Sequence, residues 1–305
     1  TYSLNNLYYI NRILNEYELD KNVTYELKLL IKIRDRYYEL DSISIITDDE
    51  IRSIKTADDF YNIHSYGNYI VINDLDLMND RRYVEYYNGT IDFQGHSVYK
   101  NIKVGYPTMI QTTGASAIVK NLDMHVYYDD NNRQYATPLI HYNNGIVSNI
   151  IYTLEESTDE YLSENGLIFE NKGIFENFVV NVKEDYYAKN YSGLIANYNC
   201  GIIRNGYLYG KKMYAIDNSG VIAGYSYGPS QMENIFSLID VVDTANDLSI
   251  GNIVGSAIHG TFKNIYTYSQ DTNRNTTRDI NFEKIGTINT SNVFYINPDI
   301  HINTR

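Results

Sequence analysis

The segment Ile146-Val147-Ser148-Asn149-Ile150 decides the fold, because versions of it return along most of the chain. Each copy has an aliphatic residue, one or two further residues, an asparagine and another hydrophobic residue in the same order. The asparagines of these copies are Asn121, Asn149, Asn177, Asn205, Asn234, Asn264 and Asn292. Neighbouring asparagines are 28, 28, 28, 29, 30 and 28 residues apart. This regular period predicts a repeat architecture.

Two further features recur in step with the asparagines. An aliphatic pair precedes the asparagine by about ten residues, at Leu139-Ile140, Leu167-Ile168, Leu194-Ile195, Val221-Ile222 and Ile253-Val254. A glycine precedes it by four residues, at Gly145, Gly173, Gly201 and Gly260. Helical repeats can have a similar period, but short apolar runs interrupted by glycine are typical of β-strands. Each repeat is therefore expected to form a strand, a glycine turn, a second strand and a variable remainder.

Repeats of this kind are typical of a parallel β-helix, since no hairpin signal dominates the sequence. We expect a mainly β protein with a right-handed parallel β-helix of about seven coils over residues 64–305. Stacked coils bring equivalent side chains to a spacing of about 4.8 Å. The seven asparagines are therefore predicted to form a structural ladder of amide hydrogen bonds, rather than a ligand site.

Residues 1–63 show a different pattern, which predicts an α-helical cap for the first coil of the β-helix. Apolar residues fall at helical spacing over residues 4–17 and again over residues 29–40. Two capping sequences, Thr47-Asp48-Asp49-Glu50 and Thr56-Ala57-Asp58-Asp59, predict short helices that run through Ile54 and Ile63.

Composition limits the classes of partner. The 305 residues carry a net charge of −13, which opposes binding to nucleic acid or to an anionic membrane. No apolar run approaches the length of a membrane span and no signal peptide opens the chain, so membrane insertion is not expected. Thr1 in place of methionine predicts a fragment of a longer protein. The single cysteine, Cys200, is interpreted as a small turn residue.

Metal, cofactor and serine-protease sites find little support in the sequence. Asp74, Asp76 and Asp80 could bind Ca²⁺, but they lack the glycine and the distant glutamate of an EF-hand loop. Asp217-Asn218-Ser219-Gly220 resembles the nucleophile loop of a serine protease, yet it is in phase with the preceding repeat. No glycine loop for phosphate leads from a strand into a helix, so no cofactor is expected.

Carbohydrate chemistry on an outer sheet is the main enzymatic alternative. The candidate acids are Asp123, Glu176 and Glu233, which we place in different columns of the stack without a recurring basic partner. His125 and His259 are interpreted as surface or turn residues with no acid in the same column. We therefore assign no catalytic residue and expect this chain not to be an enzyme.

The positions two and four residues after each ladder asparagine are expected to point outward. In the later repeats these positions hold Tyr207, Tyr209, Phe236, Leu238, Tyr266, Tyr268, Phe294 and Ile296. In the earlier repeats we place Asp123, His125, Thr153 and Asn181 there. An exposed aromatic surface of this kind predicts a binding face for a protein or a glycan. The alternatives are a face covered by a neighbouring domain, and an inverted phase that would place these residues in the core.

The order of motifs from Thr56 to Ile63, Tyr69 to Leu77 and Gly89 to Val98, followed by the coils, resembles a known family over roughly residues 56–268. It is similar to the β-helical N-terminal region of the immunoglobulin A protease-type zinc metallopeptidases of Gram-positive bacteria. Related coils occur in bacterial surface adhesins, which are a further alternative. The resemblance implies a secreted or cell-wall-attached parent protein. In it, the β-helix would recognise a host glycoprotein such as immunoglobulin A, or serve as a spacer.

The metallopeptidase motif itself is missing from the chain. The histidines are His64, His96, His125, His141, His259 and His301, and none stands in a His-Glu-x-x-His sequence. Zinc is therefore expected only in a separate catalytic domain of the parent protein.

Overall fold

The computed structural model describes residues 24–33, 36–46, 51–102, 108–128, 137–157, 161–244, 250–268, 280–282 and 288–296. The chain divides into two compact units, Thr1–Arg52 and Ser53–Arg305. This division lies earlier in the chain than the predicted boundary at residue 63.

The first unit contains an antiparallel pair of strands, β1 (Thr24–Ile33) and β2 (Arg36–Ile46). The predicted helix over residues 29–40 is therefore wrong. Apolar and polar residues alternate along β1 from Tyr25 to Leu29, and this period of two favours a strand over a helix. The predicted helix over residues 4–17 and the capping sequence at 47–50 lie outside the described residues.

The described part of the cap holds one short helix, so the helical N-terminal cap is not confirmed. Ile51–Ile54 forms strand β3 instead of the predicted end of a helix. The second capping sequence does begin a helix, α2 (Ala57–Tyr61), which ends two residues before Ile63. Its capping box is complete, because Asp59 N donates to Thr56 Oγ1 and Thr56 N donates to Asp59 Oδ2. The buried Phe60 packs near Phe93 of the first coil, with ring centroids 6.3 Å apart.

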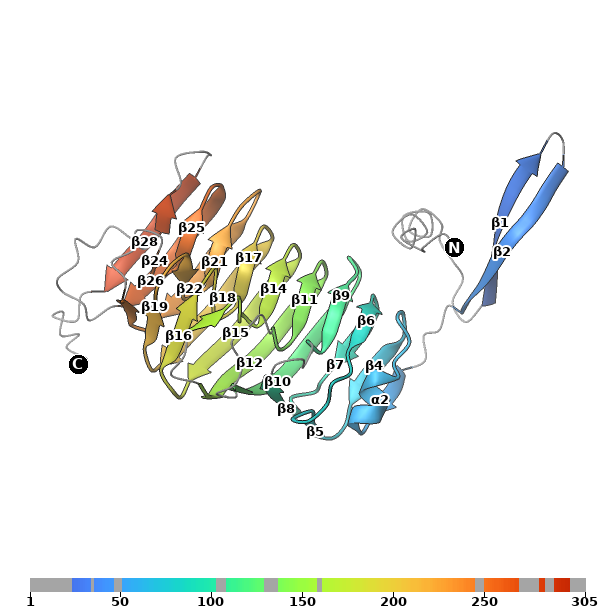
Figure 1. Ribbon diagram of the computed structural model, residues 1–305, viewed down its shortest axis with the longest axis horizontal. Helices are drawn as coiled ribbons and strands as arrows, with labels where there is room; N and C mark the ends of the chain where they lie inside the picture. Colours follow the sequence, from blue (N-terminus) through green and yellow to red (C-terminus); the bar gives the residue numbers. More distant parts are fainter. Residues whose placement is uncertain are drawn as a thin grey trace. The chain divides into compact units, whose positions relative to one another are not determined.

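The second unit is a parallel β-solenoid of about six turns, which confirms the predicted fold class (Figure 1). Its first sheet runs along the stack through β3, β4 (Asn68–Val71), β7 (Thr90–Asp92), β10 (Ile118–Tyr128), β12 (Ile146–Glu156), β15 (Ile174–Val182), β18 (Ile202–Gly210), β22 (Gln231–Ser237), β26 (Gly260–Tyr268) and β28 (Ile288–Ile296), with β5 (Leu75–Asp76) and β8 (Ser97–Ile102) beside this path. Seven was an overestimate of the number of coils, because seven recurring asparagines delimit six repeats.

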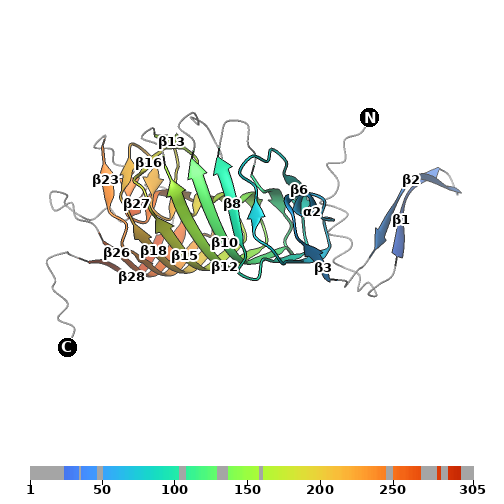
Figure 2. The same cartoon turned by 90° about the horizontal axis from the view of Figure 1, so that it is seen from below.

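Three further sheets close the turns of the solenoid. The second sheet contains β6 (Val84–Tyr87), β9 (Ile110–Thr113), β11 (Ile140–Asn143), β14 (Ile168–Asn171), β17 (Ala196–Asn199), β21 (Ala223–Ser226), β25 (Val254–Ala257) and β27 (Ile280–Phe282). The third contains β13 (Leu162–Ser163), β16 (Tyr186–Lys189), β19 (Met213–Ala215) and β23 (Val241–Asp243), and the fourth pairs β20 (Ser219–Gly220) with β24 (Ile250–Gly251). Figure 2 shows β10, β12, β15 and β18 lying next to one another in the first sheet.

The recurring asparagines make the bend within each long strand of the first sheet. From Asn121 to Asn264 these six residues have positive φ angles between 53° and 59°, a conformation that asparagine tolerates better than most residues. Their side chains also bond along the stack. Asn149 donates to Asn121, Asn205 to Asn177, Asn234 to Asn205 and Asn264 to Asn234, over 2.9–3.1 Å. We call this column the outer ladder; the side chain of Asn292 lies outside the described side chains.

A second column of asparagines lies inside the solenoid and was not predicted from the sequence. Asn143, Asn171 and Asn199 are fully buried at equivalent positions of β11, β14 and β17. The Nδ2 atom of Asn143 donates to Asn171 Oδ1 over 2.8 Å, and that of Asn171 donates to Asn199 Oδ1 over 2.9 Å. We call this column the inner ladder. Each member stands two residues before a recurring glycine, and this spacing could have predicted the inner ladder from the sequence.

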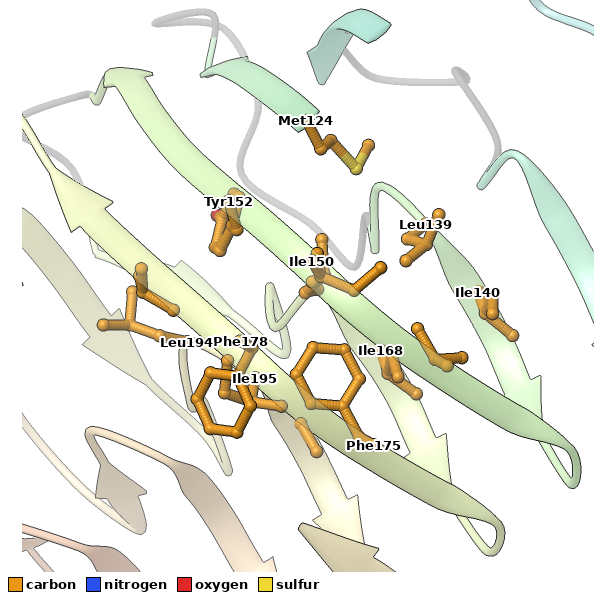
Figure 3. Packing of buried hydrophobic residues seen from close by; sticks show 14 of the residues in the cluster. Met124, Leu139, Ile140, Ile150, Tyr152, Ile168, Phe175, Phe178, Leu194 and Ile195 are labelled. Carbon is orange, nitrogen blue, oxygen red and sulfur yellow. The ribbon is translucent and has the colours of Figure 1, made fainter. Parts of the chain in front are cut away.

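The core fills the space between the first and second sheets. Figure 3 shows Ile150, Phe175 and Phe178 of the first sheet gathered with Ile140 and Ile168 of the second. These side chains are almost completely buried. They belong to one continuous hydrophobic cluster that runs from Ile54 to Ile265.

Gly206 makes room for the Phe178 ring in the adjacent coil. The two residues pair in register, and a Cβ atom added to Gly206 would lie 2.0 Å from Phe178 Cζ. We expect Gly206→Ala to lower the free energy of unfolding by about 1–2 kcal/mol, because the buried ring must shift within a packed core. Urea unfolding followed by circular dichroism measures this change. Adding Phe178→Leu should recover part of the loss, and a double variant no more stable than Gly206→Ala would contradict this packing argument.

Candidate binding surface

The outward face of the first sheet holds the predicted aromatic residues. In β18, Leu208 is buried while its neighbour Tyr207 is 38% exposed. Tyr266 is exposed to the same extent and Phe236 is half-buried. The predicted phase is therefore correct for these three side chains, and the inverted phase is wrong.

One outward column of the first sheet is apolar over five adjacent strands. Its members are Ile151, Val179, Tyr207, Phe236 and Tyr266, which pair in register from β12 to β26. We call this column the apolar ribbon. Ring centroids lie 5.9 Å apart between Tyr207 and Phe236, and 6.2 Å apart between Phe236 and Tyr266. Ile151 is 50% exposed, so the apolar surface begins two coils earlier than predicted.

Other predicted surface residues extend or adjoin this ribbon, but Thr153 is buried, so its predicted exposure is wrong. Tyr209 lies half-buried in the next outward column, and its ring stacks on Tyr207 with a centroid distance of 5.2 Å. The backbone of Phe294 pairs with that of Tyr266, and Tyr268 pairs with Ile296. The side chains of Tyr268, Phe294 and Ile296 lie outside the described side chains.

A charged cluster adjoins the ribbon at its N-terminal end. Asp123 occupies the same column as Ile151, and His125 lies between two acids. His125 Nε2 lies 3.3 Å from Asp123 Oδ2, while Nδ1 lies 2.7 Å from Glu155 Oε1. Lys183 Nζ is 2.6 Å from Glu155 Oε2. Partial burial raises the pKa of Glu155, but hydrogen bonds from Lys183 and His125 outweigh it and bring the pKa below its ordinary value.

The prediction that His125 has no acid in its column is correct, because His125 pairs in register with Tyr99 and Thr153. Its two acidic neighbours, Asp123 and Glu155, come from outside that column. The pairing of β10 with β12 shifts after Val126, so Glu155 is an extra residue that the regular repeat does not anticipate. Such a bulge re-aims side chains, and here the Glu155 carboxylate reaches His125 in the adjacent strand.

The other candidate acids belong to a single column of alternating charge. Glu176, Arg204, Glu233 and Lys263 pair in register on four successive strands. Arg204 Nη2 lies 2.7 Å from Glu176 Oε2. The prediction that Glu176 and Glu233 lie in different columns without a basic partner is thus wrong. Each of these charged residues directly precedes an outer-ladder asparagine, a signal visible in the sequence. Opposite charges on neighbouring strands stabilise the sheet.

The remaining candidates are engaged in local structure. Ser219 is fully buried, and its hydroxyl donates to the backbone oxygen of Asp217 over 2.6 Å. His259 lies between β25 and β26, where its backbone oxygen accepts from Ser230 Oγ. Cys200 lies half-buried in the turn between β17 and β18.

The predicted Ca²⁺ candidates do not converge on one point. Asp74 accepts from the Ser97 backbone, Asp76 from the Met78 backbone, and Asp80 from Arg82. Within the described ranges, no group of three or more His, Cys, Asp or Glu side chains could hold a metal ion. Among the same residues, no helix has the length and apolarity needed to cross a membrane.

A second aromatic cluster covers part of the second sheet and was not predicted. Tyr198 lies 5.3 Å from Phe169 and 6.3 Å from Tyr225, measured between ring centroids. Its hydroxyl donates to Glu164, and that of Tyr227 donates to Glu170. The hydroxyls of Tyr198 and Tyr227 are thus engaged with the chain's own carboxylates, so this cluster is a weaker candidate for a partner than the ribbon.

Comparison of the chain with protein-family models, curated proteins and solved structures returned no match.

Proposed function

We propose that the solenoid is a noncatalytic recognition module that binds a protein partner along the apolar ribbon. The observation that supports this function is the ribbon itself, which presents five apolar side chains on adjacent strands. A contiguous apolar strip at the surface is unfavourable in water and favours burial against a partner. Tyrosine is particularly suited to such contacts, because its apolar ring carries a polar hydroxyl at the rim.

The composition of the ribbon favours a protein partner over a glycan at this face. A glycan carries many hydroxyl groups that need hydrogen-bond partners, whereas the ribbon offers five apolar side chains on adjacent strands. Apolar side chains of a protein can pack against such a continuous strip.

The parent protein and the partner follow from the sequence resemblance alone. We propose a secreted or cell-wall-attached metallopeptidase of the immunoglobulin A protease type, with its zinc in another domain. The partner is then a host glycoprotein such as immunoglobulin A. An adhesin, or a ribbon covered by a neighbouring domain of the parent, are the alternatives.

Binding to immunoglobulin A tests this proposal. Tyr207→Ala and Tyr266→Ala are each expected to weaken binding about tenfold, because central aromatic contacts often contribute 1–2 kcal/mol or more. Biolayer interferometry with immobilised immunoglobulin A measures the affinity. Tyr83→Ala is the matched control, since Tyr83 is 44% exposed and lies outside the first sheet.

Two results would count against the proposal. Equal affinities for the three variants and the wild type would exclude the ribbon as the contact. Absence of binding by the folded wild-type chain would exclude immunoglobulin A as the partner.

Carbohydrate chemistry is a second candidate function. The observation that favours it is the Asp123–His125–Glu155 cluster, which brings two carboxylates and a histidine to one outer face. Release of reducing or unsaturated sugars by the purified chain would favour this function over simple recognition.

A further inference from the structure

A surface depression lies at the N-terminal end of the apolar ribbon. It has a volume of about 400 Å³ and is lined by Gln94, Gly95, Asn121, Leu122, Asp123, Asn149 and Ile151. The lining combines three side-chain amides, one carboxylate and the half-exposed Ile151. These three amide side chains belong neither to the apolar ribbon nor to the charged cluster.

The depression forms because one turn of the solenoid is longer than those that follow. Asp92 pairs with Lys120, and Ser97 pairs with Asp123. The earlier coil therefore has four residues between Asp92 and Ser97, whereas the next coil has only two residues between Lys120 and Asp123. Gln94 and Gly95 lie at the centre of this longer turn with φ angles of 52° and 83°. Their turn forms the wall that the tight asparagine bends of the later coils lack.

The outer ladder is interrupted at the same place. Asn149 donates to Asn121, but no hydrogen bond joins the Asn149 and Asn177 side chains, both of which lie in the described part of the chain. The Asn149 side-chain oxygen at the depression therefore lacks the donor that Asn121, Asn177, Asn205 and Asn234 receive from the following coil.

Asp123 supplies a second acceptor at this point. Its Oδ2 atom accepts from Ser97 Oγ over 3.2 Å and lies 3.3 Å from His125 Nε2. The side chain is 27% exposed. Its other carboxylate oxygen, Oδ1, makes no hydrogen bond to a described residue and is available to a ligand.

We propose that this depression binds one sugar unit of a glycan. Side-chain amides both donate and accept hydrogen bonds, which matches hydroxyl groups. A cationic side chain of a partner only donates hydrogen bonds, so a site for it would require acceptors alone. Ile151 supplies an apolar surface for the C–H groups of the sugar ring, and the volume suits a monosaccharide. This site goes beyond the proposed protein contact: it shares Ile151 with the apolar ribbon, but none of the aromatic residues Tyr207, Phe236 and Tyr266 lines it.

Saturation-transfer-difference NMR with the purified chain tests the sugar site directly. The probes are the methyl glycosides of glucose, galactose, mannose, fucose and N-acetylglucosamine, with agmatine as a cationic probe. At least one glycoside should bind saturably in the millimolar range, and its affinity should not change with salt because the ligand is neutral. Asp123→Asn should weaken this binding about tenfold, because a hydrogen bond to a charged group is replaced by one to a neutral amide.

Two further variants separate a site effect from a folding effect. Ile151→Ala removes the exposed apolar platform and should also weaken glycoside binding. Tyr83→Ala removes an exposed aromatic residue that does not line the depression and should leave glycoside binding unchanged. Failure of any glycoside to bind, or equal binding by Asp123→Asn and the wild type, would overturn the proposal. Salt-sensitive binding of agmatine alone would overturn it in favour of a pocket for a basic side chain.

These outcomes are independent of the immunoglobulin A experiment. Glycoside binding without immunoglobulin A binding would support the sugar site and reject the proposed partner. Binding to immunoglobulin A without glycoside binding would support the ribbon as the protein contact and reject the sugar site.

Discussion

Replacing Asn171 by alanine is expected to lower the free energy of unfolding by about 3–4 kcal/mol. Asn171 is fully buried at the middle of the inner ladder. Its loss would leave the Asn143 amide with only a long hydrogen bond of 3.4 Å to the Gly145 backbone oxygen, and the Asn199 side-chain oxygen without the Asn171 donor. Each buried polar group without a partner costs about 1–3 kcal/mol, and the deleted side chain also leaves a cavity.

Asn177→Ala is the matched control for this prediction. Asn177 belongs to the outer ladder of the same coil, where its side-chain oxygen accepts from Asn205 near solvent. Water can replace that hydrogen bond, so the remaining cost is mainly that of an alanine at a φ angle of 57°, about 1–2 kcal/mol. Urea unfolding of both variants gives the comparison. Equal destabilisation would show that burial does not distinguish the two ladders.

Replacing Lys100 by methionine is expected to raise the free energy of unfolding at pH 7 by about 2–3 kcal/mol. Lys100 is fully buried in β8, where its Nζ atom donates to the backbone oxygen of Asp80 over 3.3 Å. Burial lowers its pKa from 10.5 to about 8. A shift of this size corresponds to about 3 kcal/mol of cost for keeping the lysine charged in the folded protein. The lost hydrogen bond to Asp80 offsets about 1 kcal/mol of the gain.

The same residue predicts a distinct pH dependence. Between pH 8 and pH 10.5 the unfolded chain binds the Lys100 proton more fully than the folded chain, so stability should rise with pH in this window. Buried tyrosines act in the opposite sense above pH 10, because burial raises the pKa of Tyr152 and Tyr87 above the unfolded value. The rise should therefore be visible from about pH 8 to pH 10.

Urea unfolding at several pH values measures both effects. The wild type should gain stability from pH 8 to pH 10, while Lys100→Met should not. A similar slope in the variant would assign the pH dependence to other groups. A loss of stability at pH 7 would show that the Asp80 hydrogen bond outweighs the burial of the charge.

The repeat made most of the solenoid predictable. The period of about 28 residues indicated stacked parallel strands. When coils stack, residues one period apart occupy equivalent positions, and the same asparagine recurs at these positions. The same period placed Tyr207, Phe236 and Tyr266 on the outward face, since side chains alternate along a strand. Fold class and the centre of the candidate surface were thus readable from local sequence.

Features that break the period were not predictable in the same way. The acid next to His125 comes from a bulge at Glu155, and the depression comes from a longer turn at Gln94 and Gly95. The strands β1 and β2 were mistaken for a helix because helical spacing was read over residues 29–40, although the alternation from Tyr25 to Leu29 already indicated a strand.

The sequence by itself determined the stacked coils, the bends at asparagine and the outward aromatic column. Each of these follows from a preference that acts within a few residues and is repeated in every coil. Only the tertiary structure decided which polar groups meet: the inner ladder, the buried Lys100 and the amides around the depression. Those contacts join residues about one coil or more apart, and they depend on strand register and turn length, which set where each side chain lies.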